Sequence, residues 1–314
     1  MELPAEEGRL TTSPLNVLVA TAVPVERDAV ARALSGPGGP AGSGDPAGSG
    51  GLAGSGGLAG SGGLAGSRDP AGSAGLTGSA GSTGSAGSAG SAGSAGSAGS
   101  AGSVREVARP GVTLHRARDG WDLLAAGVGP ALAAASTAAA LTAAALDGTP
   151  YGLVVSAGIG GGFPPHAPVG SLVIADEITA ADLGAETADG FLPVTELGFG
   201  TVTHRPPEAL VRAVAAETGA RPGTVLTVST VTGTAERAAA LRARHPRALA
   251  EAMEGFGVAE AATAHGVPVL ELRAVSNPVG PRDRAAWRIP DALAALTTAF
   301  GKLAPVLESW SPHD

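Results

Sequence analysis

The stretch ALAEAMEGFGVAEAATAHGVPVLELRAVSN, residues 248–277, contains a complete strand–helix–strand unit. Its two ends, 248–253 and 268–275, are short apolar runs of the length typical of buried strands. The segment between them, 255–265, is apolar and rich in alanine, as expected of a buried helix. The stretch therefore predicts two strands joined by a helix.

The same alternation extends outward along the chain in both directions. Buried strands are predicted at 17–20, 152–157, 171–178 and 223–229, and a hairpin at 112–116 and 123–127. Helices are predicted at 25–34, 131–146, 207–218, 235–245 and 291–309, the third with its proline at the first position. The glycine-rich run 158–162 is interpreted as a tight turn. Strands that alternate with helices predict an α/β fold, a three-layer αβα sandwich with a central mixed sheet.

Residues 35–103 have a different composition, almost entirely Gly, Ala, Ser and Pro, ending in a Ser-Ala-Gly repeat. Such a segment buries too little apolar surface to offset the entropy of ordering it. The short run 17–34 could not form a core alone. We therefore expect one domain over 16–314 that is interrupted by a disordered insertion at 35–103, with residues 1–15 flexible.

Composition excludes several classes of function. The chain of 314 residues has a formal net charge of −8, which argues against a nucleic-acid partner. It contains no Cys, and its six His lack ligand spacing, so no metal site and no thiol nucleophile are expected. The amino-terminal segment lacks the apolar core of a signal peptide, and no run is long enough to span a membrane. A cytoplasmic protein without membrane association is the expectation.

Unusual polar or glycine-rich features follow four of the predicted strands. They are Glu26, the run 158–162, the pair Met253-Glu254 and the pair Ser276-Asn277. Each has an ordinary structural interpretation, such as an acid in the first turn of a helix or an amide that shapes a turn. Ligands collect at the carboxyl ends of strands in open α/β sheets, so the coincidence of the four favours a binding site.

Several motifs together resemble the nucleoside phosphorylase superfamily. They are GVG at 127–129, SAGIGG at 156–161, VGSLVIAD at 169–176, MEG at 253–255 and RAVSN at 273–277. The similarity is closest to the nucleosidase branch, which includes the methylthioadenosine/adenosylhomocysteine nucleosidases. Within that branch, residues 276–284 and 287–289 resemble the futalosine hydrolases of menaquinone biosynthesis.

The resemblance implies hydrolysis of the N-glycosidic bond of a purine nucleoside through an oxocarbenium-like transition state, without a cofactor. It implies that Glu26 activates the attacking water and that Glu254 holds the ribose hydroxyls. Relatives usually form homo-oligomers, and the same is implied here. The further substrate-binding residues implied are Met253 on the ribose face, Gly158, Ile159 and Gly160 beside ribose and water, and Ser229, Thr232 and Gly233 around the purine.

Asn277 departs from the pattern of the adenine-releasing nucleosidases, which have an Asp at the matching position. An amide cannot act as a general acid, but its NH₂ can donate to O6 or N7 of a 6-oxopurine. Asn277 therefore predicts release of hypoxanthine or guanine, and futalosine carries hypoxanthine. Its acidic 5′ extension needs a cationic partner, for which Arg282, Arg284 and Arg288 are candidates, although that segment also suits a solvated loop.

The nucleophile is interpreted as water rather than phosphate. After the first strand the chain has an acid, Glu26, where a phosphate would require a cation. Two alternatives stay open: a 6-oxopurine nucleoside phosphorylase or other nucleosidase, and a catalytically silent purine-binding module. The two carboxylates argue against the second, because binding alone gains little from two acids around a neutral sugar.

Overall fold

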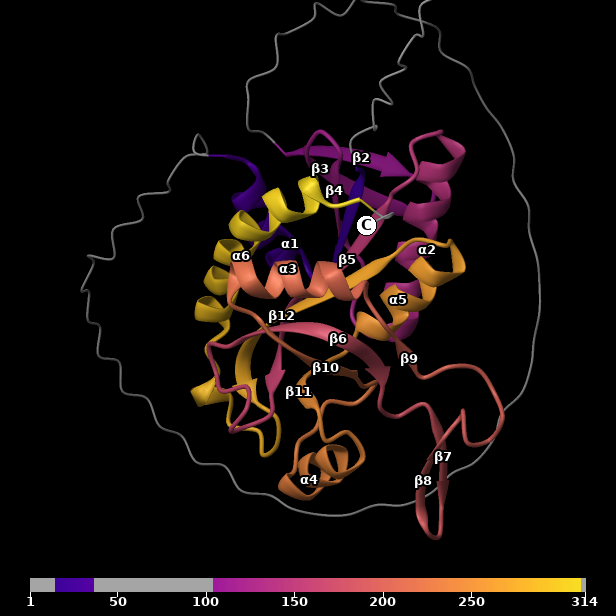
Figure 1. Ribbon diagram of the computed structural model, residues 1–314, viewed down its shortest axis with the longest axis vertical. Helices are drawn as coiled ribbons and strands as arrows, with labels where there is room; N and C mark the ends of the chain where they lie inside the picture. Colours follow the sequence, from indigo (N-terminus) through magenta and orange to yellow (C-terminus); the bar gives the residue numbers. More distant parts are fainter. Residues whose placement is uncertain (1–14, 37–103, 312–314) are drawn as a thin grey trace, which may run out of the picture. The chain divides into compact units, whose positions relative to one another are not determined.

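The computed structural model describes residues 15–36 and 104–311 (Figure 1). Its main sheet is built from β1 (Val17–Thr21), β2 (Arg105–Arg109), β3 (Val112–Arg118), β4 (Trp121–Ala125), β5 (Leu153–Gly162), β6 (Leu172–Ala180), β9 (Thr203–His204), β10 (Arg221–Thr227), β11 (Ala248–Ala252) and β12 (Val269–Pro278). The strand order is β11-β10-β6-β12-β5-β1-β4-β3-β2, with β9 beside β6. Parallel and antiparallel pairs both occur, so the sheet is mixed, as predicted.

Helices cover both faces of this sheet. They are α1 (Pro24–Leu34), α2 (Pro130–Leu146), α3 (Glu208–Thr218), α4 (Ala235–Arg244), α5 (Gly255–Ala264) and α6 (Ile289–Ser309). One apolar core joins α1, α3 and α6 to the sheet, and a second core joins α2 and α5 to it (Figure 1). The strands between these cores are buried on both faces, which explains their continuous apolar runs. The predicted three-layer arrangement is confirmed.

The strand β1 belongs to the same sheet as the elements after residue 104. It pairs in parallel with β4 on one side and with β5 on the other. Helix α1 ends at Leu34 and is capped by Ser35, which donates to the carbonyl of Ala31. Of the predicted insertion at 35–103, residues 37–103 lie outside the described residues, as do residues 1–14 and 312–314.

The predicted turn at 158–162 is wrong, because β5 continues through these residues to Gly162. The glycines serve close packing within the sheet. Beyond its pairing with β1, the end of β5 stays parallel to β12 and also pairs antiparallel with β11, where Gly161 is opposite Glu251. A Cβ on Gly160 would lie 2.8 Å from the carbonyl oxygen of Glu251. Glycine thus allows one strand to bridge two parts of the sheet.

Other boundaries also differ from the predictions. Strand β6 runs on to Ala180, and Pro207 precedes α3 as its N-cap instead of opening it. Strand β2 and the hairpin of β7 (Gly184–Thr187) and β8 (Gly190–Pro193) were not predicted. The hairpin is largely exposed and lacks the apolar alternation that reveals a strand. Among the described residues, no helix has the length and hydrophobicity needed to cross a bilayer.

Candidate active site

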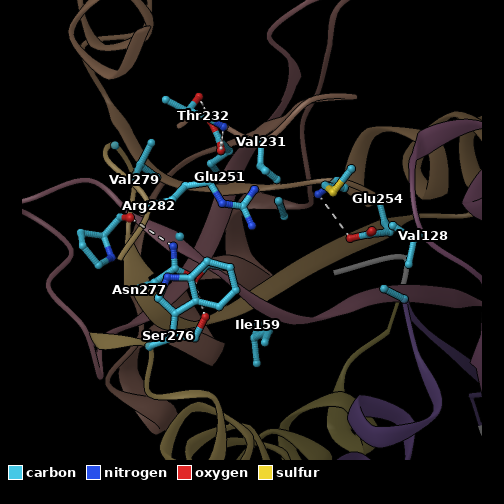
Figure 2. Close-up of a pocket in the computed structure, with 18 of the residues that line it drawn as sticks. Val128, Ile159, Val231, Thr232, Glu251, Glu254, Ser276, Asn277, Val279 and Arg282 are labelled. Carbon is cyan, nitrogen blue, oxygen red and sulfur yellow. Dashed lines mark hydrogen bonds between the residues drawn. The ribbon is translucent and has the colours of Figure 1, made fainter. Parts of the chain in front are cut away.

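A pocket of about 240 Å³ lies where the carboxyl ends of β1, β11 and β12 meet the end of β5. Most of the side chains predicted from the sequence line it (Figure 2). Both catalytic candidates are among them, together with the ribose pair and part of the glycine-rich run: Glu26, Asn277, Met253, Glu254, Ile159, Gly160, Thr232 and Arg282. Residues more than 250 positions apart in the sequence are thus brought to one cavity by the parallel strands.

Glu26, in the first turn of α1, is buried and held by backbone donors. Its Oε1 accepts from the N–H of Ile159 at 2.8 Å, and Oε2 accepts from Ala22 at 3.0 Å and from Val23 at 3.3 Å. Burial raises the pKa of Glu26 above its ordinary value, and the bond from Ile159 and the nearby Arg273 only partly oppose this. A carboxylate that is fixed in orientation and more basic than usual is suited to accept a proton.

Glu254 is the second carboxylate of the pocket and lies at the amino-terminal end of α5. It accepts from the backbone N–H groups of Gly129 at 3.2 Å and Met253 at 3.3 Å. The residue Gly129 precedes α2 with φ at 91°, a conformation that favours glycine. The GVG motif therefore turns a backbone donor toward Glu254, which fixes the carboxylate at the pocket wall.

Arg273 is a buried cation beneath the two carboxylates, and the sequence interpretation gave it no role. Its Nη1 lies 3.7 Å from Glu254, while Nε donates to Glu271 and Nη2 to Ser156, each at 2.8 Å. Burial alone lowers the pKa of Arg273, but the surrounding carboxylates raise it above its usual value. Glu271 has a pKa raised by burial. A charged pair in an otherwise apolar strand was the signal that could have indicated this network.

Gly158 does not line the pocket but lies directly behind it. A Cβ at this position would lie 2.6 Å from Oε1 of Glu26 and 2.7 Å from Nη1 of Arg273. Only a glycine leaves room for these two charged groups side by side. Its place beside the attacking water stays a prediction, and the contribution that the packing indicates is space rather than a contact.

Asn277 is partly exposed at the end of β12 and its amide has a defined orientation. Nδ2 donates to the carbonyl of Pro278 at 3.1 Å, and the hydroxyl of Ser276 donates to Oδ1 at 2.9 Å (Figure 2). Because a carbonyl oxygen can only accept, the atom that faces Pro278 must be the NH₂ group. The second N–H of that group is free to donate to a ligand.

Glu251, on β11, is a pocket residue that the sequence interpretation missed. Its Oε1 accepts from the N–H of Thr232 at 2.8 Å and its Oε2 from the Thr232 hydroxyl at 2.5 Å (Figure 2). Burial raises its pKa, and the two bonds from Thr232 oppose the shift. The sequence analysis placed Glu251 inside a predicted strand and gave it no role, and the structure shows that it lines the same cavity as Glu254.

Three other predicted residues are not part of the lining. The N–H of Ser229 donates to Asp182 at 2.7 Å, away from the pocket. Gly233 lies beside the Arg282 side chain, because a Cβ added to this glycine would lie 3.6 Å from the Cδ of Arg282. Arg284 and Arg282 both approach the Trp287 ring, at 5.9 and 5.4 Å, but only Arg282 and Trp287 reach the pocket.

No group of three or more His, Cys, Asp or Glu among the described residues is arranged to hold a metal ion. The charged and amide side chains that line the described pocket are those of Glu26, Glu251, Glu254, Asn277 and Arg282.

Comparisons with known proteins identify relatives of this chain. A family model of the phosphorylase superfamily matches residues 107–308. A futalosine hydrolase of Streptomyces coelicolor is 85% identical over 209 residues, which cover 67% of this chain and 89% of that protein. A futalosine hydrolase of Acidothermus cellulolyticus is 49% identical over 158 residues, which cover 49% of this chain and 64% of that protein.

The fold is shared with solved nucleosidases. A 5′-methylthioadenosine/S-adenosylhomocysteine nucleosidase of Colwellia psychrerythraea, in complex with adenine, has a TM-score of 0.60 at 17% identity, covering 94% of this chain and 95% of that one. The corresponding enzyme of Streptococcus pneumoniae, with 8-aminoadenine, has a TM-score of 0.60 at 16% identity, covering 92% and 99%. The chain belongs to the phosphorylase superfamily and, within it, to the family of the futalosine hydrolases.

Proposed function

We propose that this protein hydrolyses the N-glycosidic bond of futalosine, releasing hypoxanthine and dehypoxanthine futalosine in menaquinone biosynthesis. The observation that carries the proposal is that Glu26, Glu254 and Asn277 line one pocket. The names of the relatives that are 85% and 49% identical support the same substrate. The nucleosidase class is further supported by a relative of that class in Geobacillus thermodenitrificans, 30% identical over 171 residues.

The reaction exchanges one bond at the anomeric carbon of the ribose for another. The C1′–N9 bond breaks and its electron pair leaves with the base, while the oxygen of a water molecule bonds to C1′. Glu26 accepts the proton that this water loses, as its raised pKa allows. Glu254 binds the ribose hydroxyls and stabilises the positive charge that develops on the sugar. The free N–H of Asn277 donates a hydrogen bond to the departing base as negative charge builds on it, and the base then takes up a proton from solvent and leaves as neutral hypoxanthine.

The acidic 5′ extension of futalosine requires a cation at the mouth of the pocket. Arg282 is the only arginine in the lining of the described pocket, and its guanidinium lies over the face of Trp287. An exposed guanidinium beside an aromatic ring is suited to bind a carboxylate on an aromatic group. We therefore assign the substrate carboxylate to Arg282 rather than to Arg284.

Water is favoured over phosphate as the nucleophile by the charges around the anomeric site. Glu26 and Glu254 would both face a phosphate there, and the buried Arg273 is already shared among carboxylates. Placing a further anion beside two acids is unfavourable in a poorly solvated site. This argument favours hydrolysis over the phosphorylase alternative.

The test is product analysis in ¹⁸O-labelled water that contains inorganic phosphate. Hydrolysis places the label in dehypoxanthine futalosine, produces an equal amount of free hypoxanthine and forms no sugar phosphate. An unlabelled, phosphorylated sugar product would instead show phosphorolysis. Absence of any base release with futalosine, inosine and guanosine would contradict the proposed enzyme class.

A further inference from the structure

Glu251 is a buried acid at the pocket that no step of the proposed reaction uses. Only 5% of its surface is exposed. It forms no ion pair with any residue in the ranges 15–36 and 104–311, and the charges of Arg237 and Asp182 shift its pKa in opposite directions. Burying a carboxylate without a cation is energetically unfavourable. A ligand group that donates a hydrogen bond to Glu251 would stabilise the carboxylate.

Thr232 orients this carboxylate as a rigid acceptor. One donor, the backbone N–H, fixes Oε1, and the hydroxyl fixes Oε2. Each carboxylate oxygen has a second lone-pair direction that remains available. Because both Thr232 and Glu251 are buried and both line the pocket, these remaining positions can be filled only by a group that enters the cavity.

The sheet register places Glu251 and Asn277 on either side of one residue. Gly161 of β5 pairs with Glu251 of β11 and with Asn277 of β12. Neighbouring strands lie about 4.8 Å apart, so the two backbones are separated by roughly 10 Å. The side chains of Glu251 and Asn277 occupy part of this distance. The space that remains between their polar atoms suits the edge of a purine ring. Figure 2 shows Glu251 with Thr232 on one wall of the pocket and Asn277 with Ser276 on another.

We propose that Glu251 determines base specificity by accepting the N1–H of a 6-oxopurine while Asn277 donates to its O6. This inference rests on the proposed function, whose substrate class it refines. A 6-oxopurine has an acceptor at O6 and a donor at N1, which match an amide NH₂ and a carboxylate. Adenine reverses both, with an amino donor at C6 and an acceptor at N1. The amino group of adenine would face the NH₂ of Asn277, donor against donor, and its N1 would face the carboxylate of Glu251, acceptor against acceptor. Such mismatches in a buried polar site discriminate strongly between hypoxanthine and adenine.

The test compares the Kd values of hypoxanthine and adenine for the wild type and for Glu251→Gln, measured by calorimetry. In the variant, the Thr232 N–H must still face an acceptor and so holds the Gln carbonyl, which leaves the NH₂ toward the pocket. We expect hypoxanthine to bind at least about 10-fold more weakly, while adenine binds no more weakly than before. Glu208→Gln, an exposed acid on α3, is the matched control and should leave both Kd values unchanged.

The outcomes separate this inference from the proposed function. Failure of the wild type to release hypoxanthine from futalosine contradicts the function itself. Release by the wild type, with an unchanged ratio of the two Kd values in Glu251→Gln, overturns the role of Glu251 alone. If the variant does not fold, the wild type is tested with 1-methylhypoxanthine, which has no hydrogen on N1. Weaker binding by at least about 10-fold supports the N1 contact, and equal affinity overturns it.

Discussion

Glu26 and Glu254 have the same side chain but different surroundings. Three backbone N–H groups donate to Glu26, whereas two donate to Glu254, which also lies 3.7 Å from the guanidinium of Arg273. A carboxylate held beside the ribose can stabilise the positive charge that develops on the sugar. A desolvated acid with few compensating charges is instead the better proton acceptor. The division of roles that the family resemblance implies, with Glu26 acting on water and Glu254 on ribose, stays a prediction.

The raised pKa of Glu26 predicts an acid limb in the pH–rate profile. The residue acts as a base only when ionised, so kcat/KM should fall as the pH drops through its raised pKa, above the ordinary 4.5. The measurement is kcat/KM for futalosine between pH 4.5 and 8, with unfolding monitored by circular dichroism. Because the pKa of Glu251 is also raised, Glu251→Gln is the control. The acid limb should persist in this variant if it reports the ionisation of Glu26. A flat profile down to pH 4.5 would exclude Glu26 as the base.

At the scale of elements, the strands were predictable where their apolar runs are continuous, as in β1 and β12. The site residues predicted at strand ends were found together because parallel strands finish at one edge. The glycine run of β5 could not be interpreted correctly from sequence. Glycine favours turns locally, and only pairing with β11 makes these residues extended. The roles of Glu251 and Arg273 likewise depend on the register of neighbouring strands.

The packing of β5 against the charged network gives a prediction for Gly158→Ala. The added methyl group would displace Glu26 or Arg273. Because misplacement of a catalytic group by about 1 Å can cost about 100-fold, we expect kcat to fall by about 10- to 100-fold. Steady-state kinetics with futalosine is the measurement.

Gly301→Ala provides the matched control for that variant. Gly301 lies within α6, and an added Cβ there meets nothing within 4 Å. This substitution should leave kcat unchanged and stabilise the fold by up to about 1 kcal/mol, because alanine favours the helix. Equal activity of Gly158→Ala and the wild type would show that the charged network tolerates displacement.

At the scale of the whole molecule, the described elements on both sides of residues 37–103 share one sheet, and the single domain over 16–314 stays a prediction. The disordered nature of the insertion and the cytoplasmic location stay predictions. Apolar side chains near the pocket mouth are unusually exposed: Val25 at 50%, Val128 at 55% and Leu132 at 54%. Val128 also lines the pocket, so a second copy of the chain that covers this patch would help to enclose the substrate.

We therefore predict a homo-oligomer whose interface includes this exposed patch. Light scattering should give a mass at least twice that of the chain, 30.0 kDa. Val128→Asp should weaken association, since it would bury a charge in the interface. A monomeric wild type with full activity would contradict this prediction.

The central claim, that Glu26 activates water for release of a 6-oxopurine, is tested most directly by hypoxanthine release from futalosine by Glu26→Gln. An amide cannot accept the proton, so kcat should fall by about 10²- to 10⁴-fold with the fold intact by circular dichroism. Glu208→Gln, with an acid side chain that is 86% exposed, should match the wild type. Hypoxanthine release by Glu26→Gln at a rate near that of the wild type would contradict the account.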